Sequence, residues 1–216
     1  FLIVLLTASL FGQSLTYSPA EDLLNSDQTE RLEKAENYIS KGEKKITDAK
    51  AIEAKFAKKS KKSKKGKPSK YDKKVWEAKK FRILAEKDFL KAYKEATEVY
   101  SELINKAEFY DEDDIKEANS LNENAMSLIE DAEDDMKFYN NMTSDKKALQ
   151  EILSSKLNSA ISSSNGKKES AFDKQKEAID LVLAQGRKKA ENERDENAWA
   201  NAQSIHTIAA YQDYID

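Results

Sequence analysis

Residues 71–107 read YDKKVWEAKKFRILAEKDFLKAYKEATEVYSELINKA, and this segment without Gly or Pro carries the strongest structural signal in the chain. Its apolar residues fall into rows that repeat every seven residues: Ala78, Ala85, Ala92 and Val99 in one row, Phe89, Ala96 and Leu103 in the next, with Phe81, Tyr93 and Tyr100 beside them. That spacing places the rows on one face of a helix, opposite a face of Lys and Glu. Such a helix is roughly 55 Å long and cannot bury its own apolar face, so we expect other helices to cover it.

The composition favours an all-α protein. The chain has 216 residues, of which 39% are hydrophobic and 36% are charged, with only five Gly and two Pro. Runs of alternating β-branched residues, which mark strands, are nearly absent after Pro19. The low apolar content predicts elongated helices with narrow seams rather than a thick core. The net charge of −3 favours no particular class of partner.

The residue inventory argues against catalysis. The chain has no Cys, which excludes disulfides, zinc–thiolate sites and thiol nucleophiles. Its single His, His206, cannot supply the two Glu-x-x-His motifs of a di-metal helical bundle, and we interpret it as a turn residue. The acidic run at 111–114 lacks the Gly of a calcium loop and fits a helix N-terminus instead. Composition leaves paired carboxylates for glycoside chemistry open, but nothing in the sequence places them in a cleft. We therefore predict a protein that is not an enzyme and uses no cofactor or metal.

The N-terminal residues predict export. Residues 1–13 begin with FLIVLLTASLF, which as a helix spans about 17 Å and is too short for a hydrocarbon core of about 30 Å. We interpret them as the apolar core of a secretory signal peptide, with a retained anchor or a buried N-terminal helix as the alternative. The ending Phe-Gly-Gln is similar to signals of exported envelope proteins of Gram-negative bacteria. That resemblance implies a periplasmic or outer-membrane-associated protein without a transmembrane helix in its mature chain.

Two helical regions are expected after the N-terminal residues. Residues 14–25, which contain Pro19, are expected to form a linker. Residues 26–140 are predicted to hold helices at about 27–59, 70–109 and 112–139, of which the first two form a long antiparallel, coiled-coil-like hairpin. Gly42 lies on the apolar seam of the first helix, which indicates a close approach by its neighbour.

The second region, residues 141–216, is predicted to contain shorter helices. Thr143 or Ser144 caps the first of these. Its apolar stripe ends in three serines before Asn165-Gly166, a residue pair that favours a turn. The next helix passes Gly186 and ends near Asn192.

A Lys-rich segment between the first two helices is one candidate binding region. Residues 58–70 read KKSKKSKKGKPSK and contain no apolar side chain. Closely spaced ammonium groups can bind the phosphates of nucleic acid or lipopolysaccharide. The segment lacks the interleaved aromatics or Arg of a nucleic-acid groove, so a solvated loop is the simpler interpretation and a polyanion or envelope surface the alternative. The candidate residues are Lys58, Lys59, Lys61, Lys62, Lys64, Lys65 and Lys67.

The last 22 residues, DENAWANAQSIHTIAAYQDYID, are the other candidate. The pattern predicts that one short helix ends after Trp199 and that Thr207 caps the next. Six residues fit a pattern of a Trp, a small residue three positions on, a Thr at a turn and Ala-Tyr-x-x-Tyr: Trp199, Ala202, Thr207, Ala210, Tyr211 and Tyr214. This element resembles the tetratricopeptide-like helical repeats of bacterial envelope proteins, and the resemblance implies a protein-binding helical array.

These patterns predict a non-catalytic, exported helical scaffold or adaptor of the cell envelope. Its expected partners are other envelope proteins or further copies of the chain, and not nucleic acid. The candidate partner-binding residues are Trp199, Thr207, Tyr211 and Tyr214. The alternative function is binding to a polyanion or an envelope surface through the Lys-rich region at 55–80.

Overall fold

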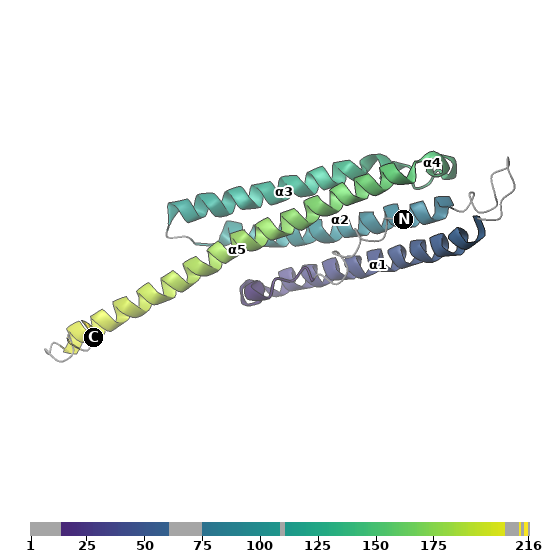
Figure 1. The fold of residues 1–216 in the computed structure, drawn as a ribbon. Coiled ribbons are helices and arrows are strands. Elements are labelled where there is room, and N and C mark those ends of the chain that lie inside the picture. Colours follow the sequence, from purple (N-terminus) through teal and green to yellow (C-terminus); the bar gives the residue numbers. More distant parts are fainter. Residues whose placement is uncertain (1–13, 61–74, 109–110, 206–211, 213, 216) are drawn as a thin grey trace.

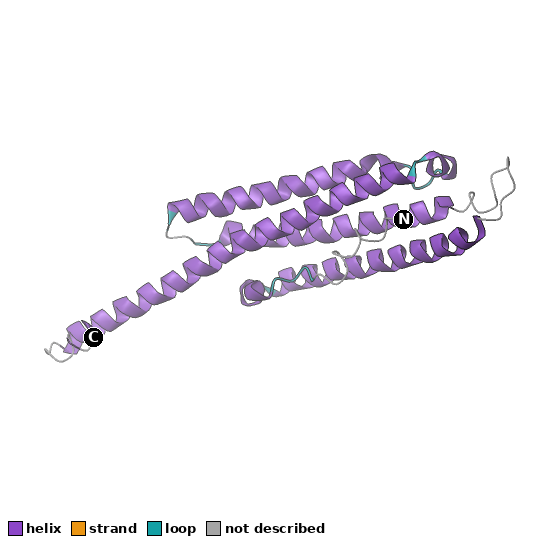
Figure 2. Ribbon diagram, in the orientation of Figure 1, coloured by secondary structure: helices purple, strands orange, loops and turns teal. Residues whose placement is uncertain are grey.

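A computed structural model of the chain describes residues 14–60, 75–108, 111–205, 212, 214 and 215, and for residues 57–60 the backbone alone. In these ranges every regular element is a helix and none is a strand (Figure 2), which confirms the predicted all-α class. The expected signal peptide at 1–13 and most of the Lys-rich segment lie outside them.

The helices form an elongated bundle around a central helix. The elements are η1 (Ser18–Leu23), α1 (Ser26–Ser60), α2 (Val75–Lys106), α3 (Glu112–Asn141), α4 (Lys146–Glu151) and α5 (Ser154–Ile205). Figure 1 shows α1 and α2 lying antiparallel and α3 on the other side of α2. The α5 helix packs along α3, crosses α2 and continues to the lower left of the view. Because α2 contacts α1, α3, α4 and α5, it is the helix that the other helices cover, as its sequence predicts.

Small residues on α2 allow this coverage. Its Ala row is buried, and the rings of Tyr93 and Tyr100 lie in the same interior. Phe172 of α5 packs against both, with ring centroids 6.2 Å from Tyr93 and 6.1 Å from Tyr100. The α1 helix also comes so close to α2 that a Cβ added to Gly42 would overlap the Phe89 ring, which confirms the close approach predicted at this glycine.

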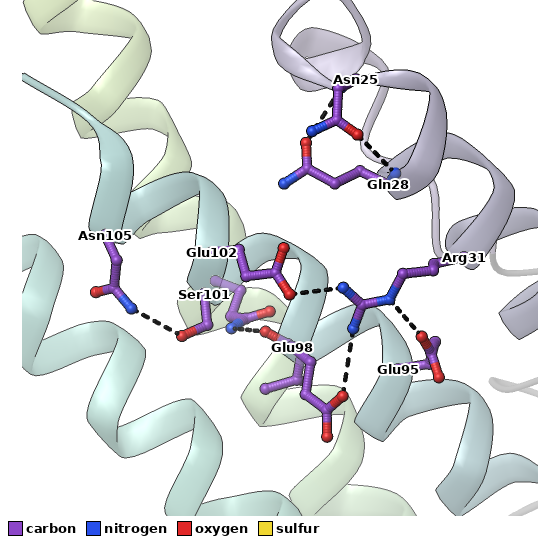
Figure 3. A network of polar contacts seen from close by, with 10 residues as sticks. Asn25, Gln28, Arg31, Glu95, Glu98, Ser101, Glu102 and Asn105 are labelled. Atoms are coloured by element: carbon purple, nitrogen blue, oxygen red, sulfur yellow. Dashed lines mark hydrogen bonds and ion pairs between the residues drawn. The ribbon is translucent and has the colours of Figure 1, made fainter.

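An ion network joins the outer faces of α1 and α2 (Figure 3). The guanidinium of Arg31 donates to Glu95 at 2.6 Å, to Glu102 at 2.6 Å and to Glu98 at 3.3 Å. The hydrogen bonds that Arg31 donates to Glu95 and Glu102 raise the pKa of Arg31, and Arg31 in turn lowers the pKa of Glu102. Since two of the carboxylates are nearly half exposed, the network stabilises the pairing modestly and mainly orients α1 on α2.

The segment at 14–25 is not a free linker but packs into the bundle. Leu15 and Ala20 are fully buried. The Tyr100 hydroxyl donates to the Leu15 carbonyl oxygen at 2.8 Å and accepts from the Tyr17 N–H at 2.7 Å. The Tyr17 hydroxyl donates to Asp180 of α5 at 2.8 Å. The sequence did not indicate this packing, because isolated apolar residues without periodicity carry no signal of burial.

Replacing Tyr100 with Phe is expected to weaken the alkaline pH dependence of stability. Burial raises the pKa of Tyr100 to about 12. The contribution of its protonated hydroxyl to the free energy of unfolding is therefore fully present below about pH 10 and is lost as the pH rises towards 12. Two pKa units correspond to about 2–3 kcal/mol. Urea unfolding of both proteins at several pH values between 9 and 12 checks this. Parallel stability curves for the wild type and Tyr100→Phe would contradict the assignment.

The α5 helix differs most from the sequence-based expectation. It runs for 52 residues without interruption through Asn165-Gly166, where a turn was predicted, and past Asn192, near which a helix end was predicted. It is therefore longer than α1 and α2, and Trp199 lies near its end rather than in a separate short helix. The packed stripe of α5 continues on both sides of Gly166, and Lys167 binds Asp135 of α3 at 2.8 Å. This tertiary packing outweighs the local turn preference of Asn-Gly.

Substituting Ala for Gly166 or Gly186 is expected to stabilise the protein by about 0.5–1 kcal/mol each. A Cβ at either position would meet no atom within 4 Å, and both residues lie inside a helix. Gly42→Ala is the matched control, which we expect to be destabilising because its Cβ overlaps Phe89. Urea unfolding measures all three variants. A loss of stability in Gly166→Ala would indicate the turn that the sequence predicts.

Candidate protein-interaction site

The interior of the bundle holds an ion pair between α2 and α5. Lys168 and Glu86 are fully buried and form a salt bridge, and the Ser164 hydroxyl donates to the same carboxylate oxygen at 2.7 Å. The Lys168 ammonium also lies 5.5 Å from the centre of the Phe89 ring. Burial lowers the pKa of Lys168, although Glu86 opposes the shift. Surrounded by packed side chains, this pair joins two helices and presents no group to solvent.

A buried amide network extends this connection to α3. Gln175 donates to the Thr97 carbonyl oxygen at 2.9 Å and to the Asn122 side-chain oxygen at 3.1 Å. Asn122 in turn donates to the Ser101 hydroxyl at 3.0 Å. These bonds tie α2, α3 and α5 together in one relative position, because a shift of any helix would leave buried amides without partners.

Neither metal ligation nor membrane crossing finds support in the described ranges. Among those residues no group of three or more His, Cys, Asp or Glu side chains is placed to hold a metal ion. None of the helices described there is both long and apolar enough to span a bilayer.

The C-terminal part of α5 leaves the bundle. Its last ion pairs with neighbouring elements are from Lys188 to Asp114 of α3 at 3.4 Å and from Lys189 to Glu108 at 2.9 Å, and Lys189 lowers the pKa of Glu108. Residues 191–201 are all exposed. Figure 1 shows this part of α5 projecting beyond the ends of the other helices. The bundle therefore presents the end of α5 in solvent.

An aromatic and aliphatic cluster lies at the end of this projection. Trp199 is 42% exposed and its ring centroid lies 5.2 Å from that of Tyr214, whose hydroxyl donates to Asp195 at 3.0 Å. Ile205 and Ile215 are 54% and 73% exposed. We call Trp199, Ile205, Tyr214 and Ile215 the distal tip. Two of the predicted partner-binding residues thus meet here, whereas Thr207 and Tyr211 lie outside the described residues.

A second apolar surface lies at the other end of α5 and was not predicted. Phe138 of α3 is 59% exposed and Leu153, between α4 and α5, is 61% exposed. They line a surface groove of about 420 Å³, which we call the α4 groove; its lining includes Phe138, Tyr139, Met142, Ile152, Leu153 and Lys156. One sequence signal was present: Phe138 and Tyr139 are adjacent, so both cannot face the interior of one helix.

Lys79 holds α4 in place beside this groove. Its ammonium donates to the carbonyl oxygens of Leu149 at 3.1 Å and of Ile152, at the C-terminal end of α4. A cation at a helix C-terminus satisfies carbonyl groups that have no partner within the helix. Desolvation lowers the pKa of Lys79, which is mostly buried. The groove is thus shaped by a helix of six residues, which α2 holds through Lys79 and through the packing of the buried Leu149 side chain.

The Lys-rich candidates are only partly placed. Lys58 and Lys59 belong to the last turn of α1, where the structure describes the backbone alone. Lys61, Lys62, Lys64, Lys65 and Lys67 lie outside the described residues. Polyanion binding by this segment stays a prediction.

Comparisons of the chain with protein-family models, with curated proteins and with solved structures found no match. The class of protein is therefore defined by the fold and its surfaces: an all-α bundle with one projecting helix.

Proposed function

We propose that the protein is a non-catalytic helical scaffold or adaptor that binds other proteins of the cell envelope through the distal tip of α5. The observation that carries this proposal is the projection itself: α5 extends past its last contacts on α3 and keeps Trp199 and Ile205 partly exposed. Because residues 191–201 of this part are exposed and Trp199 and Ile205 keep apolar surface in solvent, a partner can bury that surface.

The fold suits rigid presentation. As a continuous helix of 52 residues, α5 is about 78 Å long. The buried Lys168–Glu86 pair and the Gln175 network anchor its first half on α2 and α3, so the tip is held at a set distance from the bundle. Trp and Tyr supply a large share of the binding energy at protein interfaces, which makes Trp199 and Tyr214 suitable anchors.

The location in the envelope rests on the sequence. Residues 1–13 have the length and apolar character of the core of a secretory signal peptide, which supports a periplasmic or outer-membrane-associated protein. The similarity of residues 199–214 to tetratricopeptide-like elements supports the same role, because those elements bind proteins.

Affinity capture from the native envelope, with crosslinking and mass spectrometry, tests the proposal. Trp199→Ala is expected to lower the yield of captured partner proteins at least tenfold, because loss of a central aromatic anchor costs that much affinity. Met126→Ala is the matched control, because Met126 is also 42% exposed but lies on α3, away from the tip. Equal capture by the wild type and Trp199→Ala would contradict the proposal, as would an equal loss in Met126→Ala.

Replacing the seven candidate lysines at 58–67 with Ser separates this function from the alternative. The scaffold proposal predicts an unchanged set of captured proteins. Loss of those proteins, together with loss of salt-sensitive binding to heparin or lipopolysaccharide, would instead favour polyanion binding.

A further inference from the structure

We propose that the distal tip of one copy binds the α4 groove of a second copy. This inference rests on the proposed role of the tip as a protein-binding element and names one partner for it. It follows from three properties of the two surfaces: their apolar character, their charge and their positions at opposite ends of α5.

Both surfaces are apolar. The α4 groove has a volume of about 420 Å³, within the range of roughly 300–1,000 Å³ that is typical of sites enclosing an organic group. Phe138 and Leu153 stand exposed at its edge, and Ile152 and Met142 complete the apolar lining. The tip offers an indole and two isoleucine side chains, which are also apolar and partly exposed. Burying both surfaces against each other removes exposed hydrophobic area from water on each side.

The charges beside the two surfaces are opposite. The exposed part of α5 next to the tip carries four acidic residues and one basic residue: Glu191, Glu193, Arg194, Asp195 and Glu196. Lys156 lines the α4 groove, and the exposed Lys146 and Lys147 begin α4. Glu151 also lines the groove, and Asp145 caps α4 through the N–H groups of Lys147 and Ala148. On α3, one turn before Phe138, Asp134 pairs with Lys137 at 3.5 Å. Complementary charges of this kind steer association and set its orientation.

The positions of the two surfaces require a second molecule. The groove lies at the start of α5 and the tip lies at its end, on opposite sides of the molecule (Figure 1). A continuous helix of about 78 Å separates them, so a copy cannot fill its own groove. Two copies can exchange tips in an antiparallel dimer, or successive copies can bind head to tail in an open chain. Both arrangements contain the same contact between tip and groove.

Sedimentation of the purified chain tests the contact with a pair of complementary variants. The tip variant is Trp199→Ala with Ile205→Ser, and the groove variant is Phe138→Ser with Leu153→Ser. Wild type is expected to self-associate with rising concentration, whereas each variant alone remains monomeric. An equimolar mixture of the two variants is expected to form a 1:1 complex, because the tip variant keeps an intact groove and the groove variant keeps an intact tip. Removing one central anchor should weaken association about tenfold or more.

Trp199 also reports the contact by fluorescence. The chain has two Trp residues, so Trp76→Phe leaves Trp199 as the single emitter. Its emission is expected to shift to shorter wavelength as association removes the indole from water. Added salt should raise the protein concentration at which this shift occurs, because it screens the charges beside the two surfaces. Circular dichroism confirms that each variant is folded. If the groove variant does not fold, two charge-reversal variants are mixed instead. One carries Glu193→Lys and Glu196→Lys beside the tip, and the other carries Lys147→Glu and Lys156→Glu beside the groove.

The outcomes separate this inference from the proposed function. A wild type that stays monomeric at every concentration overturns the contact, as does a mixture of folded variants that forms no complex. If that monomer still captures envelope proteins through Trp199, the scaffold proposal stands and the second copy is excluded. If the groove variant self-associates as strongly as the wild type, the tip binds another surface and the assigned groove is wrong.

Discussion

Lys168→Met is expected to lower the free energy of unfolding by about 3–5 kcal/mol, which is a large part of the stability of a single domain. The substitution keeps most of the apolar volume of the side chain but removes its ammonium group. Glu86 then stays fully buried, and among the described residues the Ser164 hydroxyl is its remaining hydrogen-bond donor. A buried carboxylate without a counter-charge carries a desolvation cost that one hydroxyl does not offset. Urea unfolding followed by circular dichroism measures the change.

Two further variants identify the cause of this loss. Adding Glu86→Gln to Lys168→Met is expected to recover most of the stability, because a neutral amide still accepts from Ser164 and leaves no charge in the interior. Lys176→Met is the matched control: Lys176 lies on the same helix, pairs with Asp173 at its surface and should change stability by about 1 kcal/mol or less. A double variant as unstable as Lys168→Met alone would show that lost packing, and not the buried charge, is responsible.

Phe172→Ala is expected to destabilise the protein by about 3–5 kcal/mol, as is usual for truncation of a buried aromatic ring. Phe172 is 2% exposed and contacts the rings of Tyr93 and Tyr100, so its removal opens a cavity at the centre of the contact between α2 and α5. Since the hydroxyl of Tyr100 also holds the segment at 14–17, we expect this segment to loosen as well. Urea unfolding and amide hydrogen exchange of residues 14–25 check both effects.

Phe138→Ala is the control for that truncation. It removes the same ring from an exposed position in the α4 groove, and we expect a change within about 0.5 kcal/mol. If the two substitutions cost the same, the assignment of Phe172 to the core and Phe138 to the surface is wrong.

The sequence predicted the helices whose apolar residues recur at helical spacing. The rows of α2 are long and regular, and they are the residues that the other helices bury. The start of α3 was also predictable, because Asp111 precedes an acidic first turn and its carboxylate accepts from the Asp113 N–H. Gly42 was also informative, because a glycine on an apolar seam indicates that a neighbouring side chain occupies the space of its missing Cβ.

Local signals were misleading where tertiary contacts decide the conformation. Asn165-Gly166 favours a turn, yet packing against α3 carries α5 straight through it. Leu15 shows the converse, since no pattern around it indicates burial and a single distant tyrosine fixes its backbone. The Lys168–Glu86 pair could not be predicted because its members are 82 residues apart and look like ordinary surface charges. The candidate site was partly predicted: Trp199 and Tyr214 meet at the tip, while the α4 groove depends on how α3, α4 and α5 converge.

Site-specific photo-crosslinking tests most directly whether the end of α5 is the binding element. The chain has no Cys, so one introduced Cys carries a benzophenone label at a single position. Gln203 lies beside the distal tip, and Glu123 is an exposed residue of α3 far from it along the chain. In envelope fractions we predict protein crosslinks from position 203 and few or none from position 123. Equal yields at the two positions, or crosslinks from position 123 alone, would contradict the account.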